Sequence, residues 1–402
     1  HQGPSRSSCP GTPAATALEY DCGAECYTTL EAAVQADVAS TGTTLDWDFY
    51  TVANNFSTAK AGDLLKLKPV DPTTLSVISG VSVYRMRYVS EDLDGTLLPV
   101  TGFIALPNSL PDTGAFPLVA FAHGTFGMYP GCAVSNSLNL SDYRSWSLLS
   151  ERGYAVVATD YAGLGLNVTR HKYCAFSAHA KDLFHSVTAA RKAFGSVLAK
   201  QWMSVGHSQG GGAVWKLSED VVELSRVHAS EEAAQYLGTV ALAPGVKIWD
   251  LVKLAVTTLT TQPNIHTWSA TGLLPFVQVG IQRVFPEFGT TMLGKAMTRR
   301  LALAEKARVC ASGLLGLTLD LDLVQLTTLT TIRAASDVVI AEIFQNLTAP
   351  AIGARAHGPV PVLVVQGLND TAILAQGTEQ VWQSACASGS EVHLRSRTTR
   401  AS

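Results

Sequence analysis

Two hydrophobic patterns divide the chain. In residues 81–89 apolar and polar positions alternate, residues 91–95 have a turn sequence, and residues 96–106 return as a second strand segment. This pattern predicts an antiparallel pair of strands. Later segments are short and almost entirely apolar, which is typical of strands buried on both faces of a sheet. They cover residues 116–122, 154–159, 201–205, 239–243 and 361–365.

Helical patterns lie between these apolar runs, and so the runs are expected to be parallel strands. The helices are expected at residues 141–152, 178–199, 209–228 and 375–386. Repeated strand-helix-strand units predict an α/β fold, with a mostly parallel twisted sheet and helices on both faces.

One gap, between Pro244 and Gly358, is too long for a loop. Its apolar helical stretches predict an inserted, mainly helical cap at 244–358, between core segments 63–243 and 359–402. Residues 1–62 form a polar lead-in with a helical run at 24–40 and no assigned role. No transmembrane segment is expected, because polar residues interrupt the apolar run 273–285. The helical stretches of the cap are 248–259, 272–284, 297–307 and 331–344.

Composition narrows the function. Of 402 residues, 47% are hydrophobic and 15% charged, and this composition excludes a disordered chain. The formal net charge of −3 lacks the basic excess of a nucleic-acid-binding protein, so a small neutral substrate fits better.

Cysteines and glycosylation sequons favour an extracellular, secreted protein. The chain begins at His1 rather than Met, which is expected if a signal peptide has been removed. Seven cysteines without metal-ligand spacing indicate disulfides, with one thiol left over. Asn369 adjoins a buried acid and is the least expected of the glycosylation sites. The sequons begin at Asn55, Asn139, Asn167, Asn346 and Asn369.

The strand ending at Val205 runs into Gly206-His207-Ser208-Gln209-Gly210 and then into a helix. A serine between two glycines at such a junction is typical of a nucleophile elbow, in which a tight turn exposes the hydroxyl. The alternative is a glycine-rich turn that only packs the helix on the sheet.

A serine nucleophile needs a carboxylate and an imidazole, in the chain order Ser, Asp or Glu, His on this scaffold. Asp370 follows the strand at 361–365 and is the candidate acid. Its alternative role is that of a turn former or helix N-cap. His123 and His207 precede Asp370, so they are expected to shape the site rather than act as the base.

An oxyanion hole needs two backbone N–H groups. Gln209 follows the nucleophile and supplies the first, while the glycine-rich loop after the strand 116–122 offers Gly124 or Thr125 for the second. The alternative is a loop that merely connects the sheet to a helix.

Together these residues resemble the fungal secretory lipase family of α/β-hydrolases. The shared motifs are His123-Gly-Thr, 153–165 with Asp160, Gly206-His-Ser208-Gln-Gly-Gly and the segment 361–370, and the resemblance covers residues 64–395. It implies a secreted serine ester hydrolase whose cap covers the acyl-binding site and contacts a lipid–water interface. It also implies a lipid or related ester substrate, with no metal or organic cofactor. A short-chain carboxylesterase and a peptidase share the elbow and stay open.

The last residues depart from the family. Its members carry the base in a Tyr-Pro-Gly-x-x-His segment after the strand at 391–395, whereas this chain continues Ser396-Arg-Thr-Thr-Arg-Ala-Ser. His393 is the one histidine after Asp370 and is therefore the candidate base, although it lies within the strand. The expectation is a truncated or mis-spliced C-terminus with ester hydrolysis near background. A non-catalytic protein that binds apolar ligands is the alternative from another class.

Overall fold

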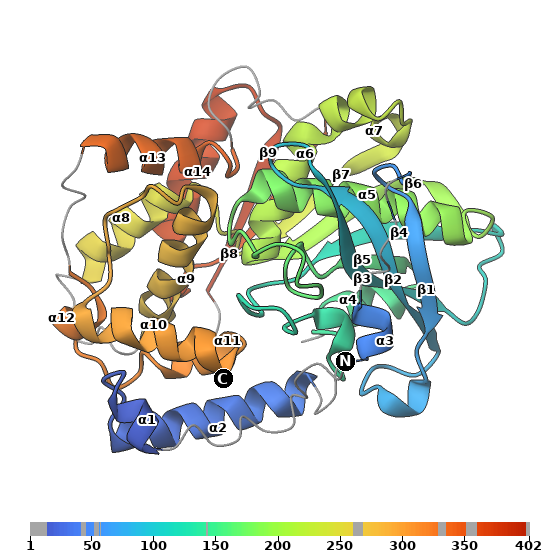
Figure 1. Ribbon diagram of the computed structural model, residues 1–402. Helices are drawn as coiled ribbons and strands as arrows, with labels where there is room; N and C mark the ends of the chain where they lie inside the picture. Colours follow the sequence, from blue (N-terminus) through green and yellow to red (C-terminus); the bar gives the residue numbers. More distant parts are fainter. Residues whose placement is uncertain are drawn as a thin grey trace.

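One twisted sheet runs through the computed structural model, which describes residues 14–41, 46–51, 56, 58–141, 144–259, 268–328, 335–350 and 360–398 (Figure 1). Within these residues nine strands pair in the order β1-β2-β3-β5-β4-β6-β7-β8-β9. The strands are β1 (Leu64–Pro69), β2 (Val81–Glu91), β3 (Leu97–Pro107), β4 (Phe116–Ala122), β5 (Ala155–Thr159), β6 (Leu198–His207), β7 (Tyr236–Leu242), β8 (Val362–Gly367) and β9 (Val392–Arg397).

Strands β5 to β9 and β4 form a parallel array, and β1, β2 and β3 extend it as antiparallel strands. The predicted pair of strands is β2 and β3, which match from Val81 opposite Pro107 to Glu91 opposite Leu97. The mostly parallel sheet predicted from the apolar runs is therefore confirmed. The edge strand β1 was not predicted, because its short Leu-Leu-Lys-Leu-Lys-Pro sequence lacks a long apolar run.

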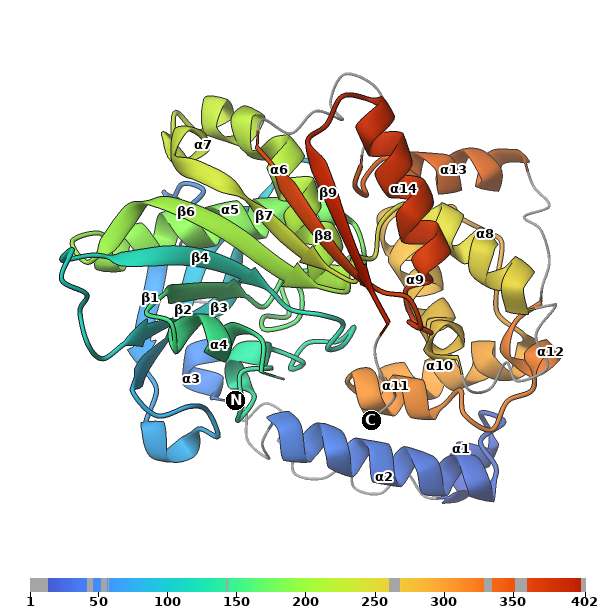
Figure 2. The ribbon, with the colours of Figure 1, turned by 180° about the vertical axis from the view of Figure 1, so that it is seen from behind.

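Two long helices lie side by side against one face of the sheet, α5 (Phe176–Phe194) and α6 (Gln209–Val227) (Figure 2). The expected helix 178–199 is too long at its end, because 198–207 is already strand β6. The expected helix 141–152 is reduced to α4 (Trp146–Ser150), on the opposite face. Shorter or peripheral helices are α7 (Glu232–Gln235) and α14 (Ala375–Ala387), which packs against β8 and β9.

Within its described residues, the segment between β7 and β8, which the sequence predicts to be a cap, forms helices and no strand. Its helices gather beyond the carboxyl ends of the parallel strands (Figure 1). A continuous hydrophobic core joins the two parts, since Phe276 and Met297 of the cap belong to the same buried cluster as Val157 and Leu183. The cap helices are α8 (Ile248–Leu259), α9 (Ser269–Val284), α10 (Lys295–Ala307), α11 (Ala311–Gly316), α12 (Leu323–Leu326) and α13 (Ala335–Gln345).

The lead-in, to which the sequence assigned no role, packs on the cap. Helix α2 (Ala24–Thr41) lies along α11, and α1 (Ala14–Leu18) lies beside it, while α3 (Trp47–Tyr50) lies near the antiparallel strands (Figure 2). The buried Asp37 carboxylate on α2 accepts hydrogen bonds from the N–H groups of Cys310 and Gly313, which satisfies donors at the start of α11.

Four of the cysteines form disulfides, Cys22–Cys26 and Cys132–Cys310. Cys174 and Cys386 are free thiols, and Cys9 lies outside the described residues. None of the described helices is long and apolar enough to cross a bilayer.

Candidate active site

Ser208 lies at the junction of β6 and α6 in a strained backbone conformation. Its φ of 55° and ψ of −117° fall in a region that residues other than glycine rarely adopt. The surrounding backbone holds this turn, because the Ser208 N–H donates to the Leu242 carbonyl at 2.9 Å and the Gly245 N–H donates to the Ser208 carbonyl at 3.0 Å. The strain lifts the side chain out of the strand end, as in a nucleophile elbow.

Close packing explains the two glycines that flank the serine. A Cβ on Gly206 would lie 2.2 Å from the Gly210 carbonyl oxygen, and one on Gly210 would lie 1.9 Å from the Ala122 carbonyl oxygen. Real side chains do not tolerate such contacts, so the turn can pass between β4 and α6 only with glycine at both positions.

Asp370 lies at the same edge of the sheet as Ser208. It follows β8, whose Val365 pairs with Leu242 of β7, and Leu242 in turn pairs with His207. The Asp370 Oδ1 atom accepts hydrogen bonds from the N–H groups of Ala372 at 2.8 Å and Ile373 at 2.9 Å. The carboxylate therefore stabilises the turn. Its Oδ2 atom lies 3.5 Å from the Gln366 amide nitrogen, which donates to it.

The loop after β4 passes directly over the elbow. A Cβ on Gly124 would lie 3.5 Å from the Ser208 Cβ and 3.2 Å from the Nδ1 atom of His207. Thr125 is fixed by a hydrogen bond of 2.9 Å between its hydroxyl and that of Tyr173. The structure thus brings Gly124 and Gln209, two of the nominated oxyanion residues, next to the serine.

An apolar cavity of about 40 Å³ opens onto Ser208 from the cap. The turn after Asp370 contributes Ala372 and Ile373, so the cavity reaches from the serine to the two residues whose N–H groups the Asp370 carboxylate binds. Sequence reasoning missed these two residues, although an apolar pair within three residues of a candidate acid is a usable signal. The other lining residues are Tyr173, Cys174, Gln209, Gly245, Ile248, Leu251, Val252, Ala255, Ala270, Leu273, Leu274 and Val277.

Gln209 is positioned by a buried histidine. The Nδ1 atom of His171 lies 3.1 Å from the Ala162 carbonyl, and its Nε2 atom lies 3.2 Å from the Gln209 amide nitrogen. Burial lowers the pKa of His171, so the ring is neutral at neutral pH. Since Nδ1–H must donate to the carbonyl, Nε2 accepts from the Gln209 amide. No sequence motif marks His171, which explains why sequence reasoning missed it.

Rings stack behind the loop after β4. The ring centroids of His123 and Tyr161 lie 4.4 Å apart, and His179 stacks on Tyr161 with the two ring centroids 4.5 Å apart. Burial lowers the pKa of His123 to about 4 and that of His179 to about 3. The Nδ1–H group of His123 donates to the Gly124 carbonyl at 2.6 Å, so His123 supports the loop, as expected.

The structure does not bring His393 to Ser208 or Asp370. His393 pairs with Leu363 in the β8–β9 register, whereas the rim of the sheet is reached four residues later, where Arg397 pairs with Gly367. Its side chain is 63% exposed and faces Glu391 at 3.4 Å. His207 lies nearer. Burial lowers the pKa of the His207 imidazole by more than the Asp370 charge raises it, so this pKa lies below its usual value. Within the described residues no histidine hydrogen-bonds to the Ser208 hydroxyl.

The sequons differ in exposure. Asn167, Asn346 and Asn369 are exposed and Asn139 is partly buried, while Asn55 lies outside the described residues. Exposure permits glycans at three sites but does not distinguish Asn369 from the others.

One group with the donor set of a metal site is found among the described residues, Glu91, His185 and His228, and it lies away from Ser208.

Comparisons with known proteins give structural neighbours and no sequence family. No protein-family model matches the chain, and no curated protein matches it. The rice cell wall degrading esterase LipA from Xanthomonas oryzae superposes with a TM-score of 0.62 at 17% identity, covering 85% of this chain and 92% of that one. Candida antarctica lipase A superposes with a TM-score of 0.65 at 14% identity, covering 88% and 80%.

A putative hydrolase from Legionella pneumophila also superposes, with a TM-score of 0.55 at 14% identity over 84% of this chain and 92% of that one. At such identities the likeness concerns the fold. The strand order, the serine turn after β6 and the helices inserted between β7 and β8 agree with it. The chain has the α/β-hydrolase fold.

Proposed function

We propose that this protein hydrolyses carboxylic esters through an acyl-enzyme on Ser208. The observation that carries the proposal is the strained Ser208 turn at the floor of an apolar cavity, with the Gln209 N–H directly after it. In this reaction the Ser208 oxygen attacks the ester carbonyl carbon, a general base takes the hydroxyl proton, and the alcohol leaves. Water then attacks the acyl-enzyme, which releases the acid and restores the serine.

Two backbone N–H groups support the charge that forms on the carbonyl oxygen. Gln209 supplies the first, and the loop at Gly124 and Thr125 supplies the second, since this loop lies against the serine. Asp370 is proposed to orient the base, because its Oδ2 atom is not used by the turn that Oδ1 holds. His393 is left out of the proposal, because it faces Glu391 below the rim.

The cap favours substrates with an apolar acyl group. Eight of the residues that line the cavity lie on α8 and α9, and all eight are apolar. We therefore place lipid esters ahead of short-chain esters and peptides as substrates, with the cap as the part that meets a lipid–water interface. The two disulfides and the exposed sequons support an extracellular location.

A serine-directed fluorophosphonate probe, together with a series of p-nitrophenyl esters, tests the proposal. We expect stoichiometric labelling at neutral pH that is abolished in Ser208→Ala. The matched control is Ser218→Ala, because Ser218 is buried on the same helix and its hydroxyl donates to the Trp215 carbonyl within that helix. Labelling that persists in Ser208→Ala would exclude Ser208 as the nucleophile.

A second candidate is a non-catalytic protein that binds apolar ligands in the same cavity. It is favoured by one observation, that no imidazole among the described residues hydrogen-bonds to the Ser208 hydroxyl. An unassisted serine is a poor nucleophile, so this candidate predicts no labelling above that of Ser208→Ala. It also predicts that a fluorescent fatty acid binds with equal affinity to wild type and Ser208→Ala.

A further inference from the structure

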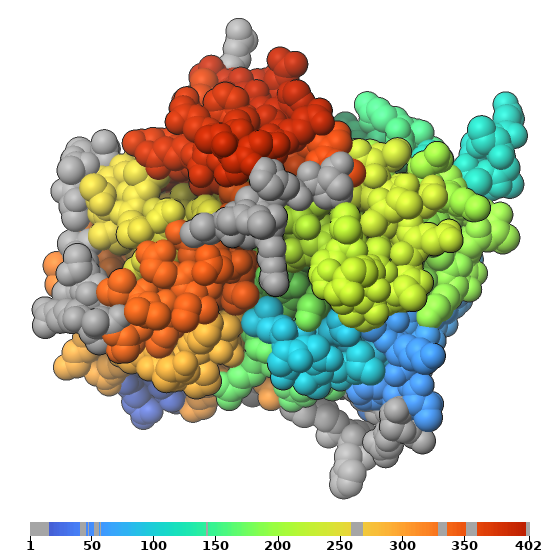
Figure 3. Space-filling view, turned by 90° about the horizontal axis from the view of Figure 1, so that it is seen from above, coloured from blue at the N-terminus to red at the C-terminus, as the bar shows by residue number. Residues whose placement is uncertain are grey.

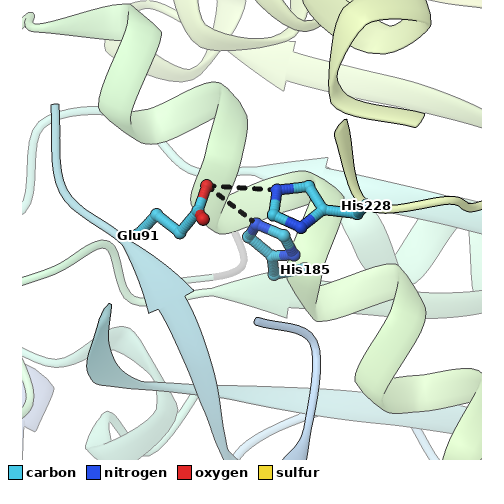
Figure 4. A group of neighbouring side chains, drawn as sticks. All are labelled: Glu91, His185 and His228. Carbon is cyan, nitrogen blue, oxygen red and sulfur yellow. Dashed lines mark hydrogen bonds and ion pairs between the residues drawn. The ribbon is translucent and has the colours of Figure 1, made fainter. Parts of the chain in front are cut away.

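Three potential metal ligands converge at the end of α6 that is remote from Ser208. Glu91 is the last residue of β2, His185 lies in the middle of α5, and His228 caps the carboxyl end of α6 (Figure 4). One ligand atom from each lies within 4.8 Å of the other two. The length of α6, about 28 Å at 1.5 Å per residue, separates this group from the catalytic serine.

The distances fit ligands around a common ion better than a complete hydrogen-bond network. The Nε2 atom of His228 lies 3.1 Å from the Glu91 Oε2 atom, which is hydrogen-bond distance. The Nε2 atom of His185 points at the same oxygen from 3.7 Å, too far for a hydrogen bond. Tetrahedral zinc with bonds near 2.0–2.1 Å places its ligand atoms about 3.4 Å apart, between the two observed values.

His185 makes the group unusual. Its side chain is 1% exposed, and its Nε2 atom has no hydrogen-bond partner among the described residues. A buried polar nitrogen without a partner costs free energy, and such a group needs an explanation. A metal ion between His185 and Glu91 supplies the missing partner.

The charges suit a divalent ion at neutral pH. The group combines one carboxylate with two imidazoles, and the Glu91 Oε2 atom faces the Nε2 atoms of both rings. Lys181 does not occupy the carboxylate, because its ammonium donates to the Asp92 carbonyl at 2.6 Å. The carboxyl end of α6, where His228 lies, also favours a positive charge.

We propose that Glu91, His185 and His228 bind a zinc ion that fastens β2, α5 and α6 together. Two imidazoles and one carboxylate are a zinc donor set, whereas magnesium and calcium prefer oxygen ligands alone. Glu91 and His228 remain 15% and 18% exposed, which leaves access for entry and for a water molecule as the fourth ligand. The distance from Ser208 makes the role structural.

Zinc binding to the purified full chain tests this. After dialysis against a chelator and its removal, Zn²⁺ is added, unbound metal is removed by gel filtration, and the metal is counted by mass spectrometry. Competition with a chromogenic chelator gives the affinity, and circular dichroism gives the Tm. We expect one zinc per chain and a rise in Tm of about 2–5 °C when zinc is in excess.

Glu91→Gln and His228→Asn are each expected to weaken zinc binding by at least about 30-fold and to remove the rise in Tm. The matched control is His393→Gln, which removes an exposed histidine from another histidine–glutamate pair and should bind zinc like wild type. The proposal is overturned if wild type retains no zinc, or if Glu91→Gln and His228→Asn retain it as wild type does.

A spectroscopic measurement on wild type covers the case in which a variant does not fold. Co²⁺ in this site should give the intense visible absorption of a four-coordinate ion. The pale spectrum of six-coordinate cobalt would contradict the proposed ligand set. Removal of the metal should leave the rate of Ser208 labelling unchanged, because the two sites share no residue.

Discussion

Cys132 and Cys310 form a disulfide that joins the loop after β4 to the N-cap residue of α11 in the cap. Next to it, Gly127 forms an isolated bridge with Cys310, and the Ala311 N–H donates to the Phe126 carbonyl at 2.9 Å. Asp37 of the lead-in contacts Cys310 from the other side, through a hydrogen bond of 2.9 Å. The lead-in, the cap and the loop after β4 therefore meet at Cys310.

Loss of this disulfide is expected to be costly. Its cysteines are 178 residues apart. A cross-link of that span lowers the conformational entropy of the unfolded chain, which in the chain-entropy account raises the free energy of unfolding by about 5 kcal/mol. We expect the Cys132→Ser/Cys310→Ser double variant to lose a large part of that amount in urea unfolding. The matched control is Cys22→Ser/Cys26→Ser, whose separation of 4 residues corresponds to about 2 kcal/mol. Equal losses in both double variants would contradict the expectation.

Gly124→Ala should lower the rate of acyl transfer without unfolding the protein. The new Cβ would lie 3.2 Å from the His207 Nδ1 atom and 3.5 Å from the Ser208 Cβ, so the loop must shift by a few tenths of an ångström. Such a shift misaligns the oxyanion donors, and we expect a loss of about 10-fold to 100-fold in kcat/KM or in the labelling rate. Gly23→Ala is the control, because nothing lies within 4 Å of its new Cβ. A wild-type rate in Gly124→Ala would remove this loop from the oxyanion hole.

Val277 offers a test of the cap as the acyl site. It lines the cavity above Ser208, whereas Val279, two residues later on α9, does not. Val277→Ala enlarges the cavity, so we expect kcat/KM for long acyl esters to change by at least about 3-fold relative to butyrate esters. Val279→Ala should leave the ratio unchanged. If both variants lose activity equally on every chain length, the cause is lower stability.

The sequence was sufficient for the elbow and most of the sheet, because both depend on local signals. Five apolar runs predicted the parallel strands β4 to β8. The two glycines around Ser208 indicated a tight turn, and a Cβ at either position would lie less than 2.5 Å from a backbone oxygen. These signals are readable because a buried strand and a tight turn each restrict the residue type at single positions.

The remainder depends on contacts between distant segments, which leave no local pattern. Asp37 and Cys310 are 273 residues apart. Nothing near Asp37 in the sequence predicts that its carboxylate binds the N–H groups at the start of a helix in the cap. In the same way His171 shares no motif with Gln209, yet it fixes that side chain. The first two residues of β6, 198 and 199, were mistaken for helix, because the exposed Lys200 separates them from the run at 201–205.

Buried histidines should make the protein sensitive to acid. Burial lowers the pKa of His123 to about 4 and that of His179 to about 3, against about 6.5 in the unfolded chain. Between these values the unfolded state binds more protons than the folded state, so the free energy of unfolding falls as the pH falls below about 6.5. Each such group contributes at most about 1.4 kcal/mol per pH unit.

His179→Phe isolates one of these groups. Neither ring nitrogen of His179 has a hydrogen-bond partner among the described residues, and the ring stacks on Tyr161, so a phenyl ring fits the position. Urea unfolding at pH 7.5, 6.0 and 5.0 should show a shallower loss of stability in this variant than in wild type. A loss as steep as that of wild type would show that His179 titrates normally in the folded protein.

His393 gives the most direct test of the catalytic assignment, because it is the one histidine that follows Asp370 in the chain. Its imidazole is 63% exposed, faces Glu391, and lies four residues before the end of the β8–β9 register, about 13 Å along the strand from the rim that carries Asp370. A base must reach the serine hydroxyl at hydrogen-bond distance, and this strand position does not allow that.

We therefore expect His393→Gln to be labelled by the fluorophosphonate probe within about 2-fold of the wild-type rate, with a stability change within about 0.5 kcal/mol. His207→Gln alters a side chain beside the nucleophile and should reduce labelling by up to about 10-fold through the shape of the site. If His393→Gln instead abolishes labelling while its circular dichroism spectrum is unchanged, β9 must rearrange to bring this histidine to Ser208.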